Sequence, residues 1–362
     1  MQSTLRLAIV GLGLVGKRHA DAIALVPDVE LVAVVDPNES GQDAAVGMGV
    51  PCFETIDGMF KSVQLDGVIL ATPTLLHIEQ AITCIENKCP VLVEKPIGAS
   101  AKEALALVQM ARARDIPLLV GHHRRHNPLI QKAKEALDSG LIGTIRAVQG
   151  TCWFYKPDHY FEAAPWRKRN GAGPISVNLV HDIDLIRYLC GEVTAVQAVA
   201  APSVRGFENE DVASAILEFS NGVIGTISVS DSVVAPWSWE FTSRENPQYP
   251  PIPESCYLIG GSEGSLSLPD LRLWSHLERQ QDWWTPLSST TLTRAASDPL
   301  VNQIAHFKDV IMKKAIPLVS GEEGLRTLEV IETIQLSAKH RTRLDIRDLT
   351  ASDVGAYRTV VS

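Results

Sequence analysis

Two groups of residues in this sequence combine cations, acids and bases in patterns that suit proton transfer. Glu94 and Lys95 directly follow the apolar run Val91–Val93, and Pro96 restricts the backbone immediately after the lysine. His181 lies farther along, on a predicted helix. An ammonium group stabilises charge that develops on an alcohol oxygen, and an imidazole accepts the departing proton. Lys95 and His181 are therefore the candidate catalytic residues.

A glycine-rich turn near the N-terminus predicts dinucleotide binding. The apolar run Leu5–Val10 leads into residues 11–16, GLGLVG, a helical stretch follows, and a second apolar run, Leu31–Val35, ends in Asp36. In this fingerprint the first glycine permits a tight turn, the second lets a pyrophosphate approach the backbone, and the third lets helix and strand pack closely. The amides at the start of the helix would bind the phosphates.

Asp36 indicates which dinucleotide is preferred. A carboxylate at this position accepts hydrogen bonds from ribose hydroxyls and repels a 2′-phosphate, and Pro37 and Asn38 supply no arginine to bind one. NAD is therefore expected in preference to NADP.

The first third of the chain alternates apolar strands with helices, as in a doubly wound parallel sheet. The further predicted elements are strands at Gly67–Ala71, Val91–Val93 and Pro117–Val120 and helices at Leu76–Asn87 and Ala101–Arg114. Ligands of such sheets bind beyond the carboxyl ends of the strands. The residues at those ends are Thr72, Pro73, Glu94, Lys95, His122 and His123.

The second part of the chain contains successive strands joined by turns rich in glycine and asparagine, which indicates antiparallel pairing. The predicted strands are Ile145–Phe154, Thr194–Ala200, Val212–Phe219, Gly222–Val229, Ser255–Ile259 and Ser265–Leu268. We expect a Rossmann domain over residues 1–124 and an α+β domain over residues 125–362, with closing helices at about 299–340.

One predicted helix, from Pro174 to Cys190, carries the second chemical group. Helical periodicity places Asn178 and His181 beside its apolar face, with Asp182 between the two faces. This position suits a cleft, although a surface asparagine and a histidine at the rim of a core would give the same pattern.

Composition favours a small-molecule partner. The formal charge of −9 and the pI near 5.6 argue against nucleic acid or an anionic membrane. The six cysteines form no CxxC pair, and neither a signal peptide nor a spanning segment is recognised, so a cytoplasmic location is expected. His122, His123 and His126 lack a nearby carboxylate or thiolate pattern, so no metal site is predicted.

The sequence resembles the family of glucose-fructose oxidoreductase, inositol dehydrogenase and MocA-type proteins. The resemblance rests on AIVGLGLVGKRHA, on VILATPTLLHIEQAITCIENKCPVLVEKPIG, on VGHHRRHNP, on APWR and on NGAGPISVNLVHDIDLIRYLCG, and it continues into the closing helices. It implies a bound nicotinamide cofactor, a lysine (Lys95) that touches both substrate and cofactor, and an open antiparallel sheet through which a homodimer or homotetramer forms.

The resemblance also reveals one departure. Members of the family commonly carry an aspartate four residues before the helix histidine, and this chain has Val177 there. Proton transfer would then depend on His181 with help from Lys95.

The expected sites draw these patterns together. The expected cofactor-binding residues are Gly11, Gly13, Leu14, Val15, Gly16, Asp36, Thr72, Pro73, His77, Glu94 and Lys95. The expected substrate-binding residues are Asn178, Asp182, His123, Trp166 and Arg167. Trp237 and Trp239 would either stack on a sugar ring or pack as ordinary apolar side chains.

Three functions fit the pattern. The first is an NAD-dependent dehydrogenase that oxidises a secondary hydroxyl of a cyclic polyol or sugar, such as an inositol or an aldose. The others are a redox-neutral enzyme of the NAD-dependent glycosidase type and a non-catalytic NAD-binding regulator.

Overall fold

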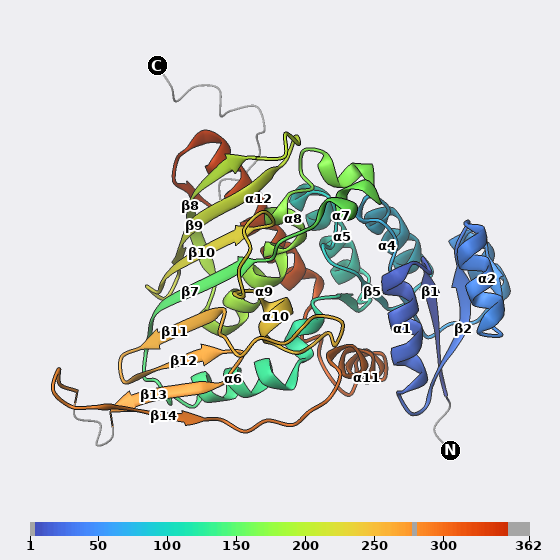
Figure 1. Ribbon diagram of the computed structural model, residues 1–362. Helices are drawn as coiled ribbons and strands as arrows, with labels where there is room; N and C mark the ends of the chain where they lie inside the picture. Colours follow the sequence, from blue (N-terminus) through green and yellow to red (C-terminus); the bar gives the residue numbers. More distant parts are fainter. Residues whose placement is uncertain (1–3, 277–280, 347–362) are drawn as a thin grey trace. The chain divides into compact units, whose positions relative to one another are not determined.

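The structure is a computed structural model that describes residues 4–276 and 281–346. Its contacts divide the chain into two compact units, one made of residues 1–127 and 297–328 and the other of residues 128–296 and 329–362. Each unit is built on one sheet (Figure 1).

The first unit contains a six-stranded, all-parallel sheet in the order β3-β2-β1-β4-β5-β6. Its strands are β1 (Leu5–Val10), β2 (Val29–Val35), β3 (Cys52–Phe53), β4 (Gly67–Leu70), β5 (Val91–Val93) and β6 (Leu118–Val120). Its helices are α1 (Leu14–Ala24), α2 (Glu39–Gly47), α3 (Ile56–Ser62), α4 (His77–Glu86), α5 (Ala101–Ala113), α11 (Pro299–Ile311) and the first part of α12 (Gly321–His340), with the short helices η1 (Thr74–Leu76) and η2 (His123–His126).

Successive residues of these strands enter two cores, one on each face of the sheet. In β1, Ala8 and Val10 join the core formed with α3, α4 and α5, whereas Leu7 and Ile9 join the core formed with α1 and α11. This double burial explains why the strands are continuously apolar. The order of the strands reverses between β1 and β4, which is where doubly wound sheets bind their ligands.

The second unit contains a nine-stranded sheet in the order β14-β13-β12-β11-β7-β10-β9-β8-β15, antiparallel except for the pair β7 and β10. Its strands are β7 (Ile145–Trp153), β8 (Val193–Pro202), β9 (Glu210–Phe219), β10 (Ile224–Ser230), β11 (Tyr257–Gly261), β12 (Gly264–Leu268), β13 (Arg272–His276), β14 (Leu287–Thr291) and β15 (Leu344–Asp345). Its helices are α6 (Pro128–Asp138), α7 (Asp158–Glu162), η3 (Pro165–Lys168), α8 (Pro174–Val177), α9 (Leu179–Cys190), α10 (Trp239–Thr242) and the second part of α12.

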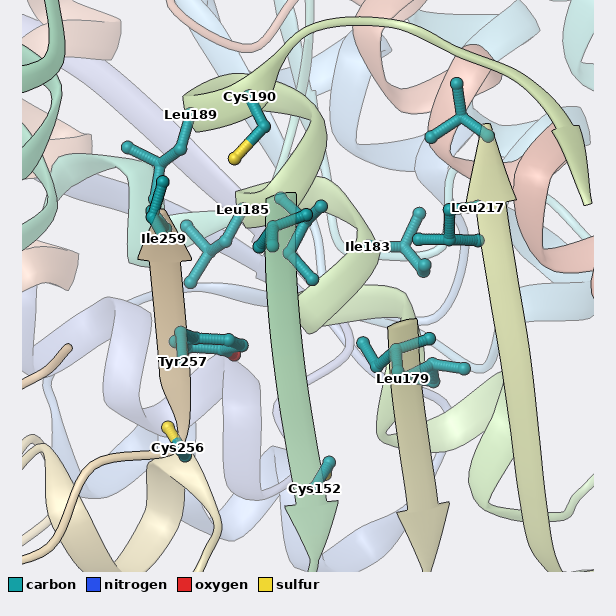
Figure 2. Packing of buried hydrophobic residues seen from close by; sticks show 14 of the residues in the cluster. Cys152, Leu179, Ile183, Leu185, Leu189, Cys190, Leu217, Cys256, Tyr257 and Ile259 are labelled. Carbon is teal, nitrogen blue, oxygen red and sulfur yellow. The ribbon is translucent and has the colours of Figure 1, made fainter. Parts of the chain in front are cut away.

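Helix α9 packs on one face of this sheet. Figure 2 shows Leu179 and Ile183 of α9 in one cluster with Leu217 of β9 and with Tyr257 and Ile259 of β11. The opposite face of the sheet has no such cover among the described residues. Four of its large apolar side chains are exposed: Val199, Ile216, Ile224 and Leu258.

The two architectures confirm the predicted fold class, a doubly wound parallel sheet followed by an α+β unit with an open, mainly antiparallel sheet. The closing helices were expected to belong to the domain over residues 125–362, but they do not all lie in the second unit. Helix α11 and the start of α12 belong to the first unit. Phe307 of α11 packs in the core with Leu7 of β1, and a side chain on Gly324 of α12 would collide with Val120 of β6.

Candidate active site

The glycine turn between β1 and α1 has the shape that a dinucleotide requires. Gly11 has φ of +89°, and a Cβ atom there would lie 2.9 Å from atoms of both Ala71 and Thr72 at the end of β4. A Cβ atom on Gly16 would collide with the carbonyl oxygen of Gly11. A Cβ atom on Gly13 would meet nothing within 4 Å, so open space lies beside this stretch of backbone. The turn therefore fits a pyrophosphate group.

Helix α1 begins directly after Gly13, so its first amides border that space. Leu14 and Val15 occupy the first turn, and the Leu14 side chain is 82% exposed. Side chains that face solvent at this position leave the backbone amides to make the contacts with a phosphate.

Asp36 is oriented by the turn that it faces. Its Oδ2 accepts a hydrogen bond from the Leu12 amide at 2.8 Å, and its Oδ1 accepts one from the Asn38 amide at 2.9 Å. A side chain on Gly41 of α2 would collide with this carboxylate, so a glycine is required there. The acid is thus fixed at the end of β2 beside the glycine turn, as the ribose of a dinucleotide requires.

The turn after β4 is tied to the turn after β5. Thr72 donates from Oγ1 to Oε1 of Gln80 at 2.6 Å, and Pro73 precedes the short helix η1. His77 is buried, with Nδ1 2.8 Å from the carbonyl oxygen of Pro96 and Nε2 2.9 Å from that of Thr72. Both ring nitrogens of this expected cofactor contact are therefore directed at backbone oxygens.

Glu94 and Lys95 form the turn after β5. Oε1 of Glu94 lies 2.7 Å from Nε2 of buried His19, and its Oε2 accepts a hydrogen bond from the Lys95 amide at 3.2 Å. Burial raises the pKa of the Glu94 carboxyl, but the hydrogen bond with His19 and the charges of His19, His123 and Lys95 outweigh it and lower the pKa to about 2. Glu94 is therefore ionised beside Lys95 in the sequence, and Lys95 is half-buried.

His19 was not expected from the sequence. It follows Gly16 by three residues and precedes Ile23 by four, and all three are buried on the same side of α1. That helical spacing is the signal that identifies it as facing the sheet.

The segment after β6 contributes His123, which is half-buried in η2 and acts electrostatically on Glu94. The neighbouring histidines have other surroundings: His122 is buried, and the ring of His126 lies 5.1 Å from that of His306. Over residues 4–276 and 281–346, no group of three or more His, Cys, Asp or Glu side chains is arranged to hold a metal ion.

In the second unit the predicted single helix is two helices, α8 and α9, that meet at Asn178. The His181 amide donates to the Asn178 carbonyl oxygen at 3.1 Å, a tight turn at the start of α9. Oδ1 of Asn178 is buried and accepts no hydrogen bond from any described residue. Asn178 and His181 are both half-buried and lie one turn apart, as the helical spacing predicts.

Asp182 departs from the position expected for it. It is fully buried, and its Oδ1 accepts a hydrogen bond from the hydroxyl of Tyr257 on β11. This carboxylate therefore packs inside the core of the second unit. The pairing connects residues 75 positions apart, which helical periodicity cannot detect.

Trp166 and Arg167 lie in η3, which precedes α8 in the chain. Trp166 is exposed, whereas the Arg167 guanidinium lies 3.9 Å from the centre of the Tyr160 ring and donates to the Tyr160 carbonyl oxygen at 2.7 Å. Asn209 donates to the Arg167 carbonyl oxygen, and the next residue, Glu210, accepts from the Ile175 amide of α8. Adjacent residues of the second unit thus hold both segments.

Trp237 and Trp239, the two tryptophans considered for stacking on a sugar ring, have different surroundings. Trp239 is buried and contributes to the core. Trp237 borders a cavity of about 290 Å³ with Gln149, Thr151 and Trp153. These β7 residues alternate with the buried Cys152 and its neighbours, so the cavity opens on the face of the sheet opposite α9.

Comparison with known proteins shows the family to which the chain belongs. A family model described as "Oxidoreductase family, NAD-binding Rossmann fold" matches residues 5–122, and one described as "GFO/IDH/MocA C-terminal domain" matches residues 130–267. The chain is 30% identical over 280 residues to "scyllo-inositol 2-dehydrogenase (NAD(+))" of Bacillus subtilis (strain 168), covering 75% of this chain and 76% of that protein. It is 27% identical over 268 residues to "2,7-anhydro-N-acetylneuraminate hydratase" of Escherichia coli (strain K12), covering 72% and 66%.

The fold has solved counterparts. The WlbA dehydrogenase from Bordetella pertussis, solved in complex with NADH and UDP-GlcNAcA, is 26% identical, matches with a TM-score of 0.76, and covers 94% of this chain and 98% of its own.

The fold and the glycine turn define an NAD-binding oxidoreductase. The chain belongs to the GFO/IDH/MocA family. This confirms the resemblance noted in the sequence. The expected NAD-binding Rossmann domain is confirmed as well. The expected enzyme class, an oxidoreductase that acts on hydroxyl groups, is confirmed at the level of the family. None of the helices in the described parts of the chain is long and apolar enough to cross a membrane.

Proposed function

We propose that this protein is an NAD-dependent dehydrogenase that oxidises a secondary hydroxyl of a cyclic polyol or sugar. The observation that carries the proposal is the position of Lys95. It lies two residues after the end of β5, which pairs with β4, and β4 pairs with β1, the strand that enters the glycine turn. A lysine therefore lies on the edge of the sheet at which doubly wound folds bind their ligands.

The residues that would hold NAD are those of the glycine turn, with Asp36 at the adenosine ribose and Thr72, Pro73 and Glu94 along the neighbouring strand ends. When bound, NAD supplies the nicotinamide carbon that accepts a hydride. The bare backbone at Gly13 and the fixed carboxylate of Asp36 support this assignment.

Lys95 and His181 are the proposed catalytic residues. His181 accepts the proton of the substrate hydroxyl, and the Lys95 ammonium stabilises the negative charge that develops on the oxygen. Val177 replaces the family's aspartate, so no carboxylate from that position assists the histidine. Glu94 is ionised at neutral pH, and its Oε2 accepts a hydrogen bond from the Lys95 amide.

Substrate hydroxyls are proposed to bind Asn178, His123, Trp166 and Arg167. The buried Oδ1 of Asn178 receives no donor from the described chain, so a substrate hydroxyl can supply one. The exposed Trp166 ring can cover an apolar sugar face. Asp182 is not proposed to contact the substrate. Its hydrogen bond with Tyr257 holds the helix α9 at the residue next to His181.

The proposal extends to assembly and location. The exposed apolar side chains on the open face of the second sheet support a homodimer or homotetramer. The six cysteines are unpaired thiols, which supports the cytoplasm as the compartment.

The test is a panel of inositols and aldoses incubated with the purified chain and NAD. The dehydrogenase hypothesis predicts net NADH with at least one of them. NAD binding with neither NADH nor any substrate conversion would mark a regulator and contradict the proposal.

One observation supports a second candidate. A relative named as a hydratase matches 72% of this chain, so the same architecture accommodates a reaction without net oxidation. A redox-neutral enzyme would convert its substrate with no net change in NADH, which the same panel detects by analysing the sugars as well as the coenzyme.

A further inference from the structure

The segment that joins α11 to α12, residues 313–320, covers the end of strand β6. The Val120 amide donates to the Val319 carbonyl oxygen at 3.0 Å, and Ser320 forms an antiparallel bridge with Leu119. β6 is the last strand in the order of its sheet, and the edge of a sheet presents unpaired backbone groups unless another segment covers it. The position of residues 313–320 therefore determines whether this end of β6 is covered.

One side chain of α11 holds the segment. The ring of His306 is half-buried, and its Nε2 accepts a hydrogen bond from the Leu318 amide at 2.9 Å. A backbone amide can only donate, so Nε2 makes this contact through its lone pair and carries no hydrogen. An imidazolium carries a hydrogen on both ring nitrogens. The protonated ring therefore cannot accept from Leu318.

The surroundings of the ring favour the form that this contact requires. Burial lowers the pKa of His306 below its ordinary value of 6.5, and the charge of Asp309 and a hydrogen bond with the Ile316 backbone oppose this effect but are smaller. A histidine with a lowered pKa stabilises the folded state through its neutral form. That stabilisation is complete above the ordinary pKa and is lost as the pH falls through the value in the folded state.

Other ionisable side chains belong to the neighbouring elements. They are His123, Arg124, Arg125 and His126 of η2, Lys313 and Lys314 of the segment, and Glu323 of α12. The ring of His126 lies 5.1 Å from that of His306, and Arg125 pairs with Glu323 at 3.0 Å. Histidine is the residue type that ordinarily changes charge between about pH 5 and 8. A test must therefore separate His306 from the histidines of η2.

We propose that His306 is a pH-sensitive switch: the neutral ring binds the Leu318 amide and keeps residues 313–320 on the edge of β6, and the protonated ring releases them. Release would also loosen the strand end from which His122 and His123 extend. The switch does not depend on the dehydrogenase proposal, because neither His306 nor Leu318 is assigned to the cofactor or the substrate.

Two substitutions separate the closed state from the open one. The side-chain oxygen of Gln is as many bonds from Cβ as Nε2 of His, so His306→Gln keeps an acceptor for the Leu318 amide that does not titrate. His306→Leu keeps an apolar side chain but offers no acceptor. His340→Gln is the matched control, because His340 is exposed at the end of α12.

The assay is amide hydrogen exchange of the full chain from about pH 7.5 to about pH 5, the range in which histidine titrates. Exchange is followed by mass spectrometry in peptides that contain Leu318 or Val120 and is corrected for the pH dependence of exchange in unstructured peptides. Peptides that contain β1 report on the unit as a whole and should change little.

In the wild type and in His340→Gln, protection at Leu318 and Val120 should fall about tenfold towards low pH, the scale of one lost hydrogen bond. His306→Gln should stay protected throughout, and His306→Leu should be poorly protected at both ends of the range. A wild type whose protection does not change would overturn the switch. So would a His306→Gln variant that loses protection in parallel with the wild type, since the response would then come from another group such as His126.

Discussion

Replacing Glu94 by Gln should remove the electrostatic stabilisation that the ionised carboxylate gives to the turn that carries Lys95. The carboxyl has its pKa lowered from 4.5 to about 2, which corresponds to about 3 kcal/mol of stabilisation of the folded state. Its side chain is only 12% exposed, so little of this is lost to solvent screening. Glutamine keeps the size of the side chain and one acceptor for His19 but removes the charge.

The sign of the pH dependence follows from the lowered pKa. The stabilisation is complete above the ordinary pKa of the carboxyl and is lost as the pH falls through the folded-state value of about 2. The difference between wild type and Glu94→Gln should therefore be full at neutral pH and shrink below about pH 4.5.

Amide hydrogen exchange in peptides that contain β4 and β5 is the suitable assay, because all seven tryptophans lie in residues 153–284, within the second unit, and do not report on the first. A loss of about 3 kcal/mol predicts exchange about 100-fold faster at neutral pH. Glu86→Gln is the control, because the Glu86 side chain is 56% exposed and 3.9 Å from Arg114, and it should change exchange little. Unchanged exchange in Glu94→Gln at neutral pH would refute the reasoning.

The remaining predictions concern the cofactor, the catalytic pair and assembly. Asp36→Ala should weaken NAD binding and narrow the preference over NADP, as measured by titration of both; a wild type that binds NADP more tightly would contradict the role of the aspartate. Lys95→Ala and His181→Ala should each reduce turnover by about 100- to 10,000-fold with a smaller change in NAD affinity for His181→Ala than for Asp36→Ala. Asn178→Ala should retain more turnover than His181→Ala, and the reverse order would move the base to another group. Light scattering at micromolar concentration should give the mass of a dimer or tetramer, and a monomeric mass would count against an interface on the open sheet.

The Rossmann unit could be predicted in detail because its signals are local. Continuous apolar runs such as Leu5–Val10 predict strands buried on both faces, and the glycine turn and Asp36 have geometric requirements that few other structures share. The structure places these elements where the sequence indicates them, except that helix α1 begins at Leu14, inside the glycine-rich segment 11–16 and not after it.

The features that escaped prediction depend on contacts between distant residues. Phe307 and Gly324 pack against strands that end by residue 120, and nothing local in α11 or α12 indicates which sheet they cover. Strands β13 and β14 lie at the exposed edge of the second sheet, where weak burial leaves little periodicity to detect.

The candidate site divides in the same way. Glu94, Lys95 and Thr72 could be located because they follow recognisable strands. His19 and the Asp182–Tyr257 pair required three-dimensional contacts, since their partners lie 75 residues away. The interruption at Asn178 was also missed, because no proline or glycine marks it.

Hydride transfer itself is tested most directly with carbon-deuterated inositols and aldoses. The chain would be incubated with NAD and each deuterated compound, and the coenzyme analysed by mass spectrometry. The proposed mechanism predicts that NADH forms with deuterium from the hydroxyl-bearing carbon of the substrate, and that Lys95→Ala and His181→Ala form it far more slowly. Conversion of a substrate without any transfer of its deuterium to the coenzyme would contradict the proposed dehydrogenase.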